Sequence, residues 1–268
     1  MNGVLLAAIQ MVSAPELEPN LEAAGRLIGE AARAGAKLVA LPENFYCISG
    51  DETAKVRLRE PDGDGPIQRF LAGAARAHRV WVVGGTAPIA CPAPARIRSA
   101  CLVYDDAGRR VARYDKMHLF RYSAGNERYD ESRTLEAGAQ PVAVESPYGR
   151  LGLSVCYDVR FPELYRGLGE IDVLFVPSAF TVQTGEAHWA TLLRARAIEN
   201  LAYVVAPAQG GLHPSGRRTY GHTLIADPWG AVLAERVEGE GVVLAHIDRA
   251  RIAQLRRDLP ALINRRLS

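Results

Sequence analysis

The stretches Leu38-Val-Ala-Leu-Pro-Glu-Asn-Phe45 and Val173-Leu-Phe-Val-Pro-Ser-Ala-Phe180 have the same form, an apolar run followed by Pro, two polar or small residues and Phe. A second pair, Cys101-Leu-Val-Tyr-Asp-Asp-Ala-Gly108 and Thr223-Leu-Ile-Ala-Asp-Pro-Trp-Gly230, is alike in the same chain order. The likeness has two possible origins. It is a chance similarity between generic strand-turn patterns, or the chain consists of two similar halves that each supply one β-sheet. In the second case we expect an α/β fold with four αββα layers, in which two mixed β-sheets pack face to face with helices outside.

Short apolar runs alternate with helical patterns along most of the chain. The predicted strands are Val4–Ile9, Lys37–Leu41, Val80–Gly84, Cys101–Tyr104, Leu151–Val155, Val173–Val176, Tyr203–Ala206, Thr223–Ala226 and Val242–Ile247. The predicted helices are Asn20–Ala34, Pro66–Ala77, Pro162–Leu168 and Ala187–Asn200.

Turn and cap residues mark the ends of these elements. Asn20 is expected to cap the first helix and Gly35 to close it. Asp105–Gly108 and Asp227–Gly230 are typical of hairpin turns, each followed by a second strand. Cys91–Arg96 is predicted to be a loop, and the polar, aromatic residues Tyr122–Thr134 a long functional loop.

Size and composition are those of an ordinary globular protein. The 268 residues are 48% hydrophobic and 23% charged, and we expect a single domain over residues 1–268, with the segment 248–268 used in oligomer contacts. The 32 basic and 30 acidic residues give a net charge of +2, which indicates neither a nucleic-acid nor a membrane partner. The pairs Arg217-Arg218, Arg256-Arg257 and Arg265-Arg266 are interpreted as solvated surface, with an anion site as the alternative.

The N-terminal run Val4–Ile9 lacks the basic start and the length of a signal peptide, and no apolar stretch reaches the roughly 18 to 20 residues of a membrane span. Four cysteines are too sparse for a disulfide scaffold, and none forms a Cys-x-x-Cys pair. We therefore expect a cytoplasmic protein with reduced thiols.

Three strand-like runs end in residues of complementary chemistry. Gly152-Leu-Ser-Val-Cys156 delivers a thiol, Leu38–Glu43 a carboxylate and Val111–Lys116 an ammonium. Nucleophilic attack on an amide needs a thiolate, a group that moves protons and a positive group near the carbonyl oxygen. An ammonium beside the thiol would favour the thiolate, and burial of Glu43 would raise its pKa toward that of a useful base.

The motifs around these residues resemble those of the nitrilase superfamily of carbon-nitrogen hydrolases. The similarity runs from Ala7 to Gly230. The motifs that carry it are Ala7-Ala-Ile-Gln-Met11, Leu41-Pro-Glu43-Asn, Tyr114-Asp-Lys116-Met-His-Leu-Phe, Val155-Cys156-Tyr-Asp-Val-Arg-Phe-Pro-Glu-Leu, Pro177-Ser-Ala-Phe, Arg194-Ala-Arg-Ala-Ile-Glu-Asn200 and Asp227-Pro-Trp-Gly. Members of this superfamily have the αββα fold, which agrees with the two similar halves.

The resemblance implies a role for each of these residues. Glu43 would be the general base, Cys156 the nucleophile, and Lys116 with the backbone N–H of Tyr157 the group that stabilises the oxyanion. Glu131 would orient Lys116 or assist proton movement. The reaction would pass through a thioester without a metal or an organic cofactor, in a homodimer or larger homo-oligomer.

The residues after Cys156 resemble the amidase branch that includes ω-amidase and deaminated glutathione amidase, because true nitrilases tend to have Trp-Glu there. A small amide that bears a carboxylate is therefore the expected substrate. Arg160 and Arg121 are candidates to bind that carboxylate, although Arg160 is equally interpreted as a buried ion-pair partner of Glu163 or Asp158. Further candidates for lining the substrate site are His118 and Phe180.

Several alternatives remain at this stage. A nitrilase or an N-carbamoyl amino acid amidohydrolase would use the same motifs, and a catalytically silent binding protein would keep the fold. Gly152-Leu-Ser154-Val-Cys156 comes within one residue of the Gly-x-Ser-x-Gly motif of serine hydrolases. A Cys-His hydrolase would pair Cys156 with a histidine, for which His118, His188 and His222 are available. The spacing of His and Cys does not predict a metal site.

Overall fold

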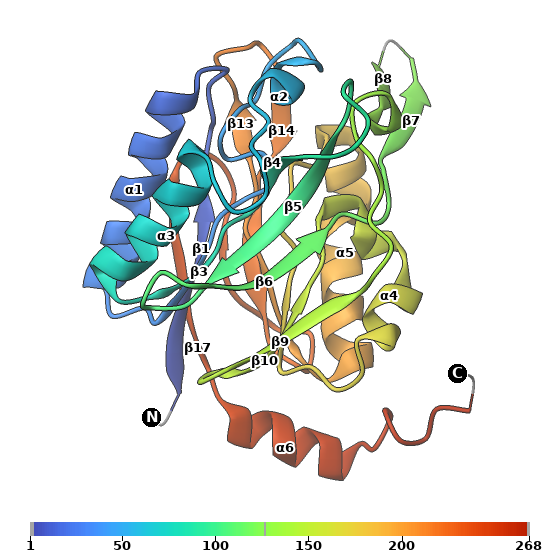
Figure 1. Cartoon of the computed structure of the whole chain (residues 1–268). Coiled ribbons are helices and arrows are strands. Elements are labelled where there is room, and N and C mark those ends of the chain that lie inside the picture. Colours follow the sequence, from blue (N-terminus) through green and yellow to red (C-terminus); the bar gives the residue numbers. More distant parts are fainter. Residues whose placement is uncertain (1–2, 126, 267–268) are drawn as a thin grey trace.

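Two large mixed β-sheets packed face to face form the centre of the molecule, and the computed structural model describes residues 3–125 and 127–266 (Figure 1). In the first sheet the strand order is β17 (Gly241–Ile247), β1 (Val4–Gln10), β2 (Leu38–Ala40), β3 (Trp81–Val83), β5 (Ile97–Tyr104) and β4 (Ala87–Ala90), and β6 (Arg110–Asp115) also pairs with β5. In the second sheet the order is β16 (Val232–Arg236), β15 (Thr223–Ala226), β12 (Tyr203–Ala206), β11 (Val173–Phe175), β10 (Gly149–Leu153) and β9 (Val142–Ser146).

The two halves of the chain build their sheets in the same way. The run β1-β2-β3-β5-β6 of the first sheet has its counterpart in β10-β11-β12-β15-β16 of the second, with parallel pairing up to the third strand and antiparallel pairing after it. The likeness of the paired sequence stretches is therefore structural. Outside this run, β4 pairs antiparallel with β5 in the first sheet and β9 pairs antiparallel with β10 in the second. Strand β17 comes from the end of the second half, but it pairs antiparallel with β1 and extends the first sheet.

Successive side chains of the strands point alternately to the two faces of a sheet, and this divides the core into two parts. Leu6 and Ala8 of β1 belong to the cluster that includes the second sheet, whereas Ala7 and Ile9 belong to the cluster that includes the helices over the first sheet. Successive side chains of a strand point to opposite faces, so a strand buried on both faces is apolar throughout. This is why β1 and its neighbours read as continuous apolar runs.

Helices cover the outer face of each sheet (Figure 1). Over the first sheet lie α1 (Leu17–Arg33) and α3 (Pro66–His78), whose Leu27, Ile28, Ile67 and Leu71 are buried. The second sheet is covered by α4 (Pro162–Gly167) and α5 (Val182–Asn200). The short helix α2 (Ala54–Arg57) and the peripheral helix α6 (Arg249–Asp258) lie outside these layers.

The structure corrects two of the predicted helix starts. Helix α1 begins at Leu17, and Asn20 lies within its first turns, where its amide donates to the carbonyl oxygens of Ala14, Glu16 and Tyr46 instead of capping the helix. Helix α5 begins five residues before Ala187, after Thr181, whose side chain accepts a hydrogen bond from the N–H of Thr184. The expected closure of α1 by Gly35 is confirmed, since this residue has a φ of +96°.

The segment predicted to be a long loop contains regular structure. Residues of β7 (Arg121–Ala124) and β8 (Glu127–Asp130) form an antiparallel hairpin that is followed by the 3₁₀ turn Glu131–Arg133. A second small hairpin consists of β13 (Gly210–Leu212) and β14 (Arg218–Tyr220). The predicted hairpin turns at Asp105–Gly108 and Asp227–Gly230 are confirmed by bonds from each Gly N–H to the carbonyl of its Asp.

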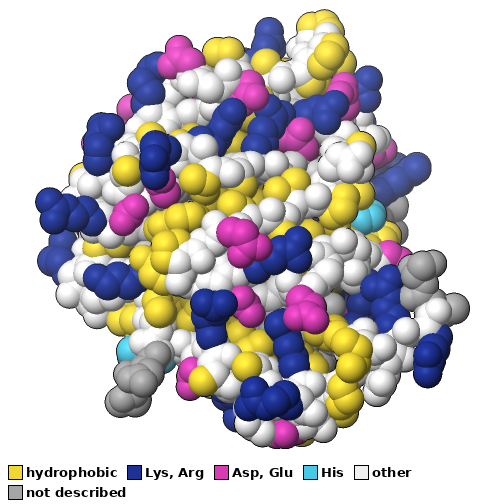
Figure 2. Space-filling view, turned by 60° about the horizontal axis from the view of Figure 1, so that its bottom comes forward, with side chains coloured by type: hydrophobic (Ala, Val, Ile, Leu, Met, Phe, Trp, Pro, Cys, Tyr) yellow, Lys and Arg dark blue, Asp and Glu magenta, His cyan; other side chains and the backbone are white. Residues whose placement is uncertain are grey.

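The face that carries α6 has mixed charge. Basic and acidic side chains are interspersed there with hydrophobic ones (Figure 2). The guanidinium of Arg256 in α6 donates to the carbonyl of Ile171 and lies close to Asp172, so Arg256 is an anchored residue and not a solvated one as predicted. In the part of the chain that the structure describes, no helix has the length and apolar content that crossing a membrane requires.

Candidate active site

Glu43 follows strand β2 and is held by its backbone. The N–H of Leu41 continues the sheet by donating to Val83, and the N–H of Asn44 donates to the Thr86 hydroxyl at 2.9 Å. Asn44 has a φ of +55°, a conformation that non-glycine residues seldom adopt. The side chain of Gln209 donates to the carbonyl of Glu43 at 3.2 Å, which connects this turn to the second half of the chain.

The ammonium of Lys116 lies between two carboxylates. Its Nζ is 2.8 Å from Oε1 of Glu43 and 2.8 Å from Oε2 of Glu131. The Lys116 side chain is 1% exposed, and its backbone bonds to Ser99 and Gly138 on either side. Glu131 is fixed in turn, because its carboxylate accepts from the N–H of Phe120 at 2.7 Å. The structure thus brings together three of the predicted catalytic residues.

Cys156 begins a 3₁₀ turn directly beyond β10, and its backbone is strained. Its φ is +50°, and its N–H donates to the carbonyl of Pro177 at 2.9 Å. A left-handed conformation at a residue with a side chain costs energy that the surrounding structure must supply, and such residues cluster at active sites. Tyr157 occupies the second position of the turn, where a backbone N–H has no earlier carbonyl of the turn to bind. Its N–H is therefore available for the predicted oxyanion role.

Asp158 ties the turn of Cys156 to the segment of Lys116. One carboxylate oxygen accepts from the N–H of Val155 and the hydroxyl of Tyr114, at 2.8 and 2.7 Å. The other accepts from the N–H of His118 at 3.0 Å and lies 2.7 Å from the His118 ring. Tyr114 and His118 flank Lys116, so one fully buried carboxylate sets the thiol and the ammonium relative to each other.

Burial of the site favours a protonated thiol. Burial raises the pKa of the Cys156 thiol well above its ordinary value, and the charge of Glu43 raises it further, against a smaller opposing effect of Lys116. Lys116 does lower the pKa of the thiol, as expected of a neighbouring ammonium, but this effect is smaller than those of burial and Glu43. Burial lowers the pKa of the Lys116 ammonium, but the negative charges of Glu131 and Glu43 outweigh the effect of burial, so this pKa is raised.

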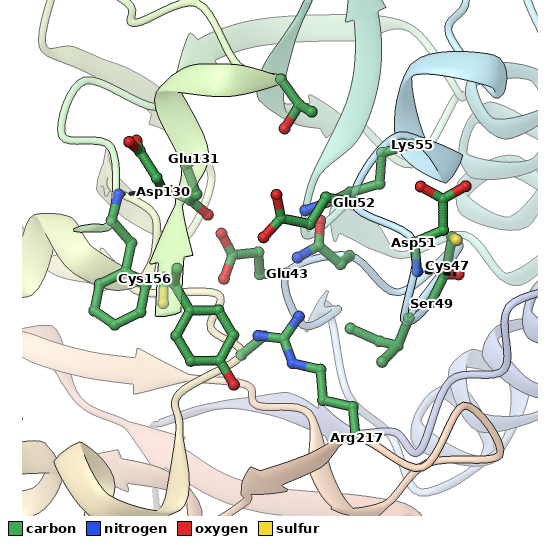
Figure 3. A pocket seen from close by; sticks show the side chains of 16 residues that line it. Glu43, Cys47, Ser49, Asp51, Glu52, Lys55, Asp130, Glu131, Cys156 and Arg217 are labelled. Atoms are coloured by element: carbon green, nitrogen blue, oxygen red, sulfur yellow. Dashed lines mark hydrogen bonds between the residues drawn. The ribbon is translucent and has the colours of Figure 1, made fainter. Parts of the chain in front are cut away.

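A cavity of about 670 Å³, part of it open to solvent, lies over these residues. Glu43, Glu131 and Cys156 line it (Figure 3). The Lys116 ammonium lies 2.8 Å from a carboxylate oxygen of each of these two glutamates. Its walls come from the segment before α2, the β7–β8 hairpin and the turn between β13 and β14.

Cys156 also lines a second, smaller cavity of about 210 Å³, together with Arg160 and Phe180. The Arg160 guanidinium lies 5.5 Å from the centroid of the Phe180 ring and 5.7 Å from that of Tyr157, and its Nη1 is 3.2 Å from His188. Within residues 3–125 and 127–266 it forms no ion pair, so its interpretation as a partner of Glu163 or Asp158 is not supported.

Two of the predicted substrate contacts lie outside both cavities. The His118 ring stacks on Phe161 with the ring centroids 3.7 Å apart and bonds to Asp158, so it acts within the scaffold. Arg121 on β7 is 84% exposed and lies 4.0 Å from Asp130, on a separate depression of the surface. The structure thus places Arg160 and Phe180, but neither His118 nor Arg121, next to Cys156.

Lys55 and Arg217 line the large cavity and were not predicted there. The prediction that Arg217 is solvated surface is wrong, since its Nε is buried. Its neighbour Arg218 does face solvent and pairs with Glu238. Arg217 lies in the turn before β14 and Arg218 is the first residue of that strand, so strand alternation does not separate the two and no local sequence signal does.

The competing site chemistries find no support in the geometry. Ser154 is fully buried, and its hydroxyl donates to Phe175 and accepts from Tyr165, so it does not lie in the cavity as a serine nucleophile would. The histidines proposed as partners of Cys156 do not line its cavities either. Across the described ranges, no group of three or more His, Cys, Asp or Glu residues is arranged to hold a metal ion.

Comparison with known proteins agrees with this geometry. The model of the carbon-nitrogen hydrolase family matches residues 5–257. The chain is 45% identical, over 99% of both sequences, to a protein of Synechocystis named deaminated glutathione amidase.

Two solved structures have the same fold. The NitFhit protein of Caenorhabditis elegans matches with a TM-score of 0.90 and 40% identity over 98% of this chain, which spans 65% of the NitFhit chain. Nit3 of Saccharomyces cerevisiae, described as a member of branch 10 of the nitrilase superfamily, matches with a TM-score of 0.87 and 30% identity over 96% of this chain and 94% of its own. The αββα sandwich is thus confirmed by comparison.

Proposed function

Because this chain belongs to the carbon-nitrogen hydrolase family and is an amidase, we propose that it hydrolyses a small carboxylate-bearing amide of the deaminated glutathione type. The observation that carries the proposal is the Lys116 ammonium held at 2.8 Å from both Glu43 and Glu131, beneath a cavity that Cys156 lines. The relatives named deaminated glutathione amidase support this substrate over an ω-amide of a simpler keto acid.

In the proposed mechanism the Cys156 sulfur attacks the amide carbon while Glu43 takes the thiol proton. The base is needed because burial and the charge of Glu43 keep the pKa of this thiol high. Lys116 and the N–H of Tyr157 stabilise the charge that develops on the carbonyl oxygen. Glu43 then gives its proton to the leaving nitrogen, and the C–N bond breaks to leave a thioester.

Hydrolysis of the thioester completes the cycle. Glu43 takes a proton from a water molecule as that water attacks the thioester carbon, and returns a proton to the Cys156 sulfur as the acid product forms. Glu131 is proposed to hold Lys116 in place, since the carboxylate of Glu131 is itself fixed by the N–H of Phe120.

The test is a hydrolysis screen combined with intact mass spectrometry. The panel contains deaminated glutathione, ω-amides of keto acids, N-carbamoyl amino acids and simple nitriles. We expect fastest turnover of deaminated glutathione and an acyl adduct that is absent from the Cys156→Ala variant. Faster turnover of a nitrile or a carbamoyl compound would assign the chain to another reaction of the superfamily. No product and no adduct with any compound would support a silent binding protein.

We also propose a cytoplasmic homo-oligomer, a homodimer or larger, in which the C-terminal segment 248–268 forms contacts. Leu259 and Ile263 of this segment are 42% and 76% exposed and offer apolar side chains for such contacts. The four cysteines are free thiols, as a reducing compartment requires. Analytical ultracentrifugation of the wild type and of Ile263→Glu tests the assembly, and a monomeric wild type would contradict it.

A further inference from the structure

Two cationic side chains face the large cavity without an acidic partner. Lys55 of α2 and Arg217 of the β13–β14 turn both point into it (Figure 3). Neither forms an ion pair within the described part of the chain, whereas the neighbouring Arg57 and Arg218 pair with Asp51 and Glu238. The Nε of Arg217 is also buried without a hydrogen-bond partner. A buried donor without an acceptor is costly, so these atoms point to an anionic ligand.

The turn that carries Arg217 is firmly anchored to the catalytic region. His213 bonds through its two ring nitrogens to the carbonyl of Ser13 and the hydroxyl of Thr219, at 3.0 and 2.8 Å. Gln209 donates to the Ser13 hydroxyl and to the carbonyl of Glu43. The position of Arg217 is thereby fixed relative to the backbone of the predicted base.

The side chain of Arg217 is further restrained by Tyr129 of β8, whose ring centroid lies 5.3 Å from the guanidinium carbon. Burial lowers the pKa of His213, so this ring is neutral at pH 7 and adds no charge to the turn. The guanidinium is therefore the cation that the turn brings to the cavity. A planar guanidinium held on an aromatic ring is suited to bind a carboxylate through two parallel hydrogen bonds.

Lys55 is a half-buried ammonium on the same cavity. Burial lowers its pKa, and the charge of Glu131 opposes this effect only in part. An anion bound beside Lys55 would restore the favourable interactions that its charge loses on burial. Glu52 also lines the cavity, but it is exposed, so water screens its carboxylate.

Glu43 shows which part of the substrate lies near these cations. Cys156 lines both cavities, so the scissile amide lies between them. Glu43 lines only the larger one, and in the proposed mechanism it gives a proton to the leaving nitrogen. The leaving amine therefore extends into the cavity of Lys55 and Arg217, and the acyl group toward Arg160.

We propose that Lys55 and Arg217 bind a carboxylate carried by the leaving amine of the substrate. This inference rests on the proposed amidase function and specifies it, because it selects amides of amino acids or short peptides over amides that release ammonia. In the step concerned, the Cys156 sulfur bonds to the acyl carbon, the C–N bond breaks, and the amine leaves with the proton that Glu43 took from the thiol.

The first test compares deaminated glutathione with the same compound whose C-terminal carboxylate is a carboxamide. We expect kcat/KM to be about 10- to 100-fold higher for the acid, which is the range for loss of a hydrogen bond to a charged group. Arg217→Gln and Lys55→Gln should lose this preference, because their kcat/KM should fall much further on the acid than on the carboxamide. Arg217→Lys should restore part of it, because it keeps the charge but not the planar fork.

Matched controls separate local from long-range effects. Arg218→Gln and Lys37→Gln remove the same charge from exposed positions outside the cavity, and should retain the preference. The rate of thioester hydrolysis should be equal in wild type and Arg217→Gln, because the amine has already left. Equal losses on acid and carboxamide, or an absent preference in the wild type, would overturn the inference.

A binding measurement keeps the inference independent of turnover. Calorimetry on the Cys156→Ala variant, with glycylglycine and glycylglycinamide as probes, should show at least about tenfold tighter binding of the acid, a difference removed by Arg217→Gln. Tighter binding without hydrolysis of any amide would support the subsite and refute the proposed function. Hydrolysis of amides with equal binding of both probes would refute the subsite alone.

Discussion

Replacing Lys116 by Met should make the stability of the protein strongly dependent on pH. In the wild type the ammonium lies 2.8 Å from a carboxylate oxygen of Glu43 and of Glu131, and the three side chains are 1%, 3% and 18% exposed. At an effective dielectric constant of about 20, each contact corresponds to roughly 6 kcal/mol of Coulomb energy before the costs of burial are subtracted. Met preserves most of the volume but leaves two buried carboxylates facing each other.

The protein can limit this cost by taking up one proton. Burial by itself would raise the pKa of Glu131. The positive charges of Lys116 and Lys55 outweigh burial, so the pKa of Glu131 is lowered in the wild type. Without Lys116 we expect burial to prevail and the pKa of Glu131 to rise. Protonating a carboxyl with an unfolded-state pKa near 4.3 costs about 4 kcal/mol at pH 7 and about 1 kcal/mol at pH 5. The variant should lose about these amounts relative to the wild type.

Whether stability rises or falls with pH depends on how the pKa of Glu131 differs between the folded and the unfolded state. In the wild type the lowered pKa of Glu131 contributes stability that is present above its unfolded pKa and is lost as the pH falls through the folded one. In Lys116→Met the folded state would hold the extra proton, so stability falls as the pH rises. Urea denaturation at pH 5, 6, 7 and 8 measures both profiles.

A double variant provides the control for this experiment. Lys116→Met with Glu131→Gln removes one of the two facing charges, so it should be more stable than Lys116→Met at pH 7 and should lose most of the pH dependence. Lys37→Met, at an exposed position, should match the wild type. A loss for Lys116→Met below about 1 kcal/mol at pH 7, or an equal loss at pH 5, would refute an ammonium clamped between two ionised carboxylates.

Four further predictions concern the thiol, the proposed base and the scaffold. Because the pKa of Cys156 is raised well above its ordinary value, the 240 nm absorbance difference between wild type and Cys156→Ala should show no thiolate step below pH 9. Glu43→Gln should lower kcat/KM by about 10²- to 10⁴-fold in a stopped assay, and a loss under threefold would exclude a base role. Ser154→Ala should keep turnover within about twofold but cost about 1–3 kcal/mol in urea unfolding, because the Tyr165 hydroxyl loses its acceptor. Asp158→Asn should lower both kcat and the urea midpoint, since an amide cannot accept from all of its present donors, and unchanged values would contradict its anchoring role.

The strands and the convergence of Glu43, Lys116 and Cys156 were predictable from sequence for physical reasons. Strands buried on both faces are apolar throughout, and polar residues directly after such strands stand out at the sheet edge. Helix α5 shows the opposite case. Its first turn contains Val182, Thr184 and Gly185, all poor helix formers, and a Cβ at Gly185 would lie 2.2 Å from the ring of Tyr220. Packing requires the glycine there, so local propensity predicts too late a start.

The cavity wall was not predictable in the same way. Arg217 lies in a turn whose placement depends on contacts to Ser13, 200 residues away from His213 in the chain, and no local pattern encodes such a contact. The same holds for Asp158, whose partners belong to the segment of Lys116. Sequence motifs marked the residues that carry the proposed chemistry, whereas the groups that position them became visible only with the fold.

The two similar halves explain why the site has a single copy. Leu6 of β1 pairs with Leu38 of β2 in the first half, as Leu151 of β10 pairs with Val173 of β11 in the second. Leu6 and Leu151 are therefore equivalent positions. Met11 lies as far beyond Leu6 as Cys156 lies beyond Leu151, so Met11 is the counterpart of Cys156 in the first half.

The position of Glu43 corresponds in the same way to Ser178, which is fully buried. The position of Asp158 corresponds to Ser13, and both anchor a turn at the sheet edge. The scaffold is thus duplicated, but each half carries only part of the proposed chemistry. The proposed base comes from the first half and the proposed nucleophile from the second, so the face-to-face packing of the two sheets is what assembles the site.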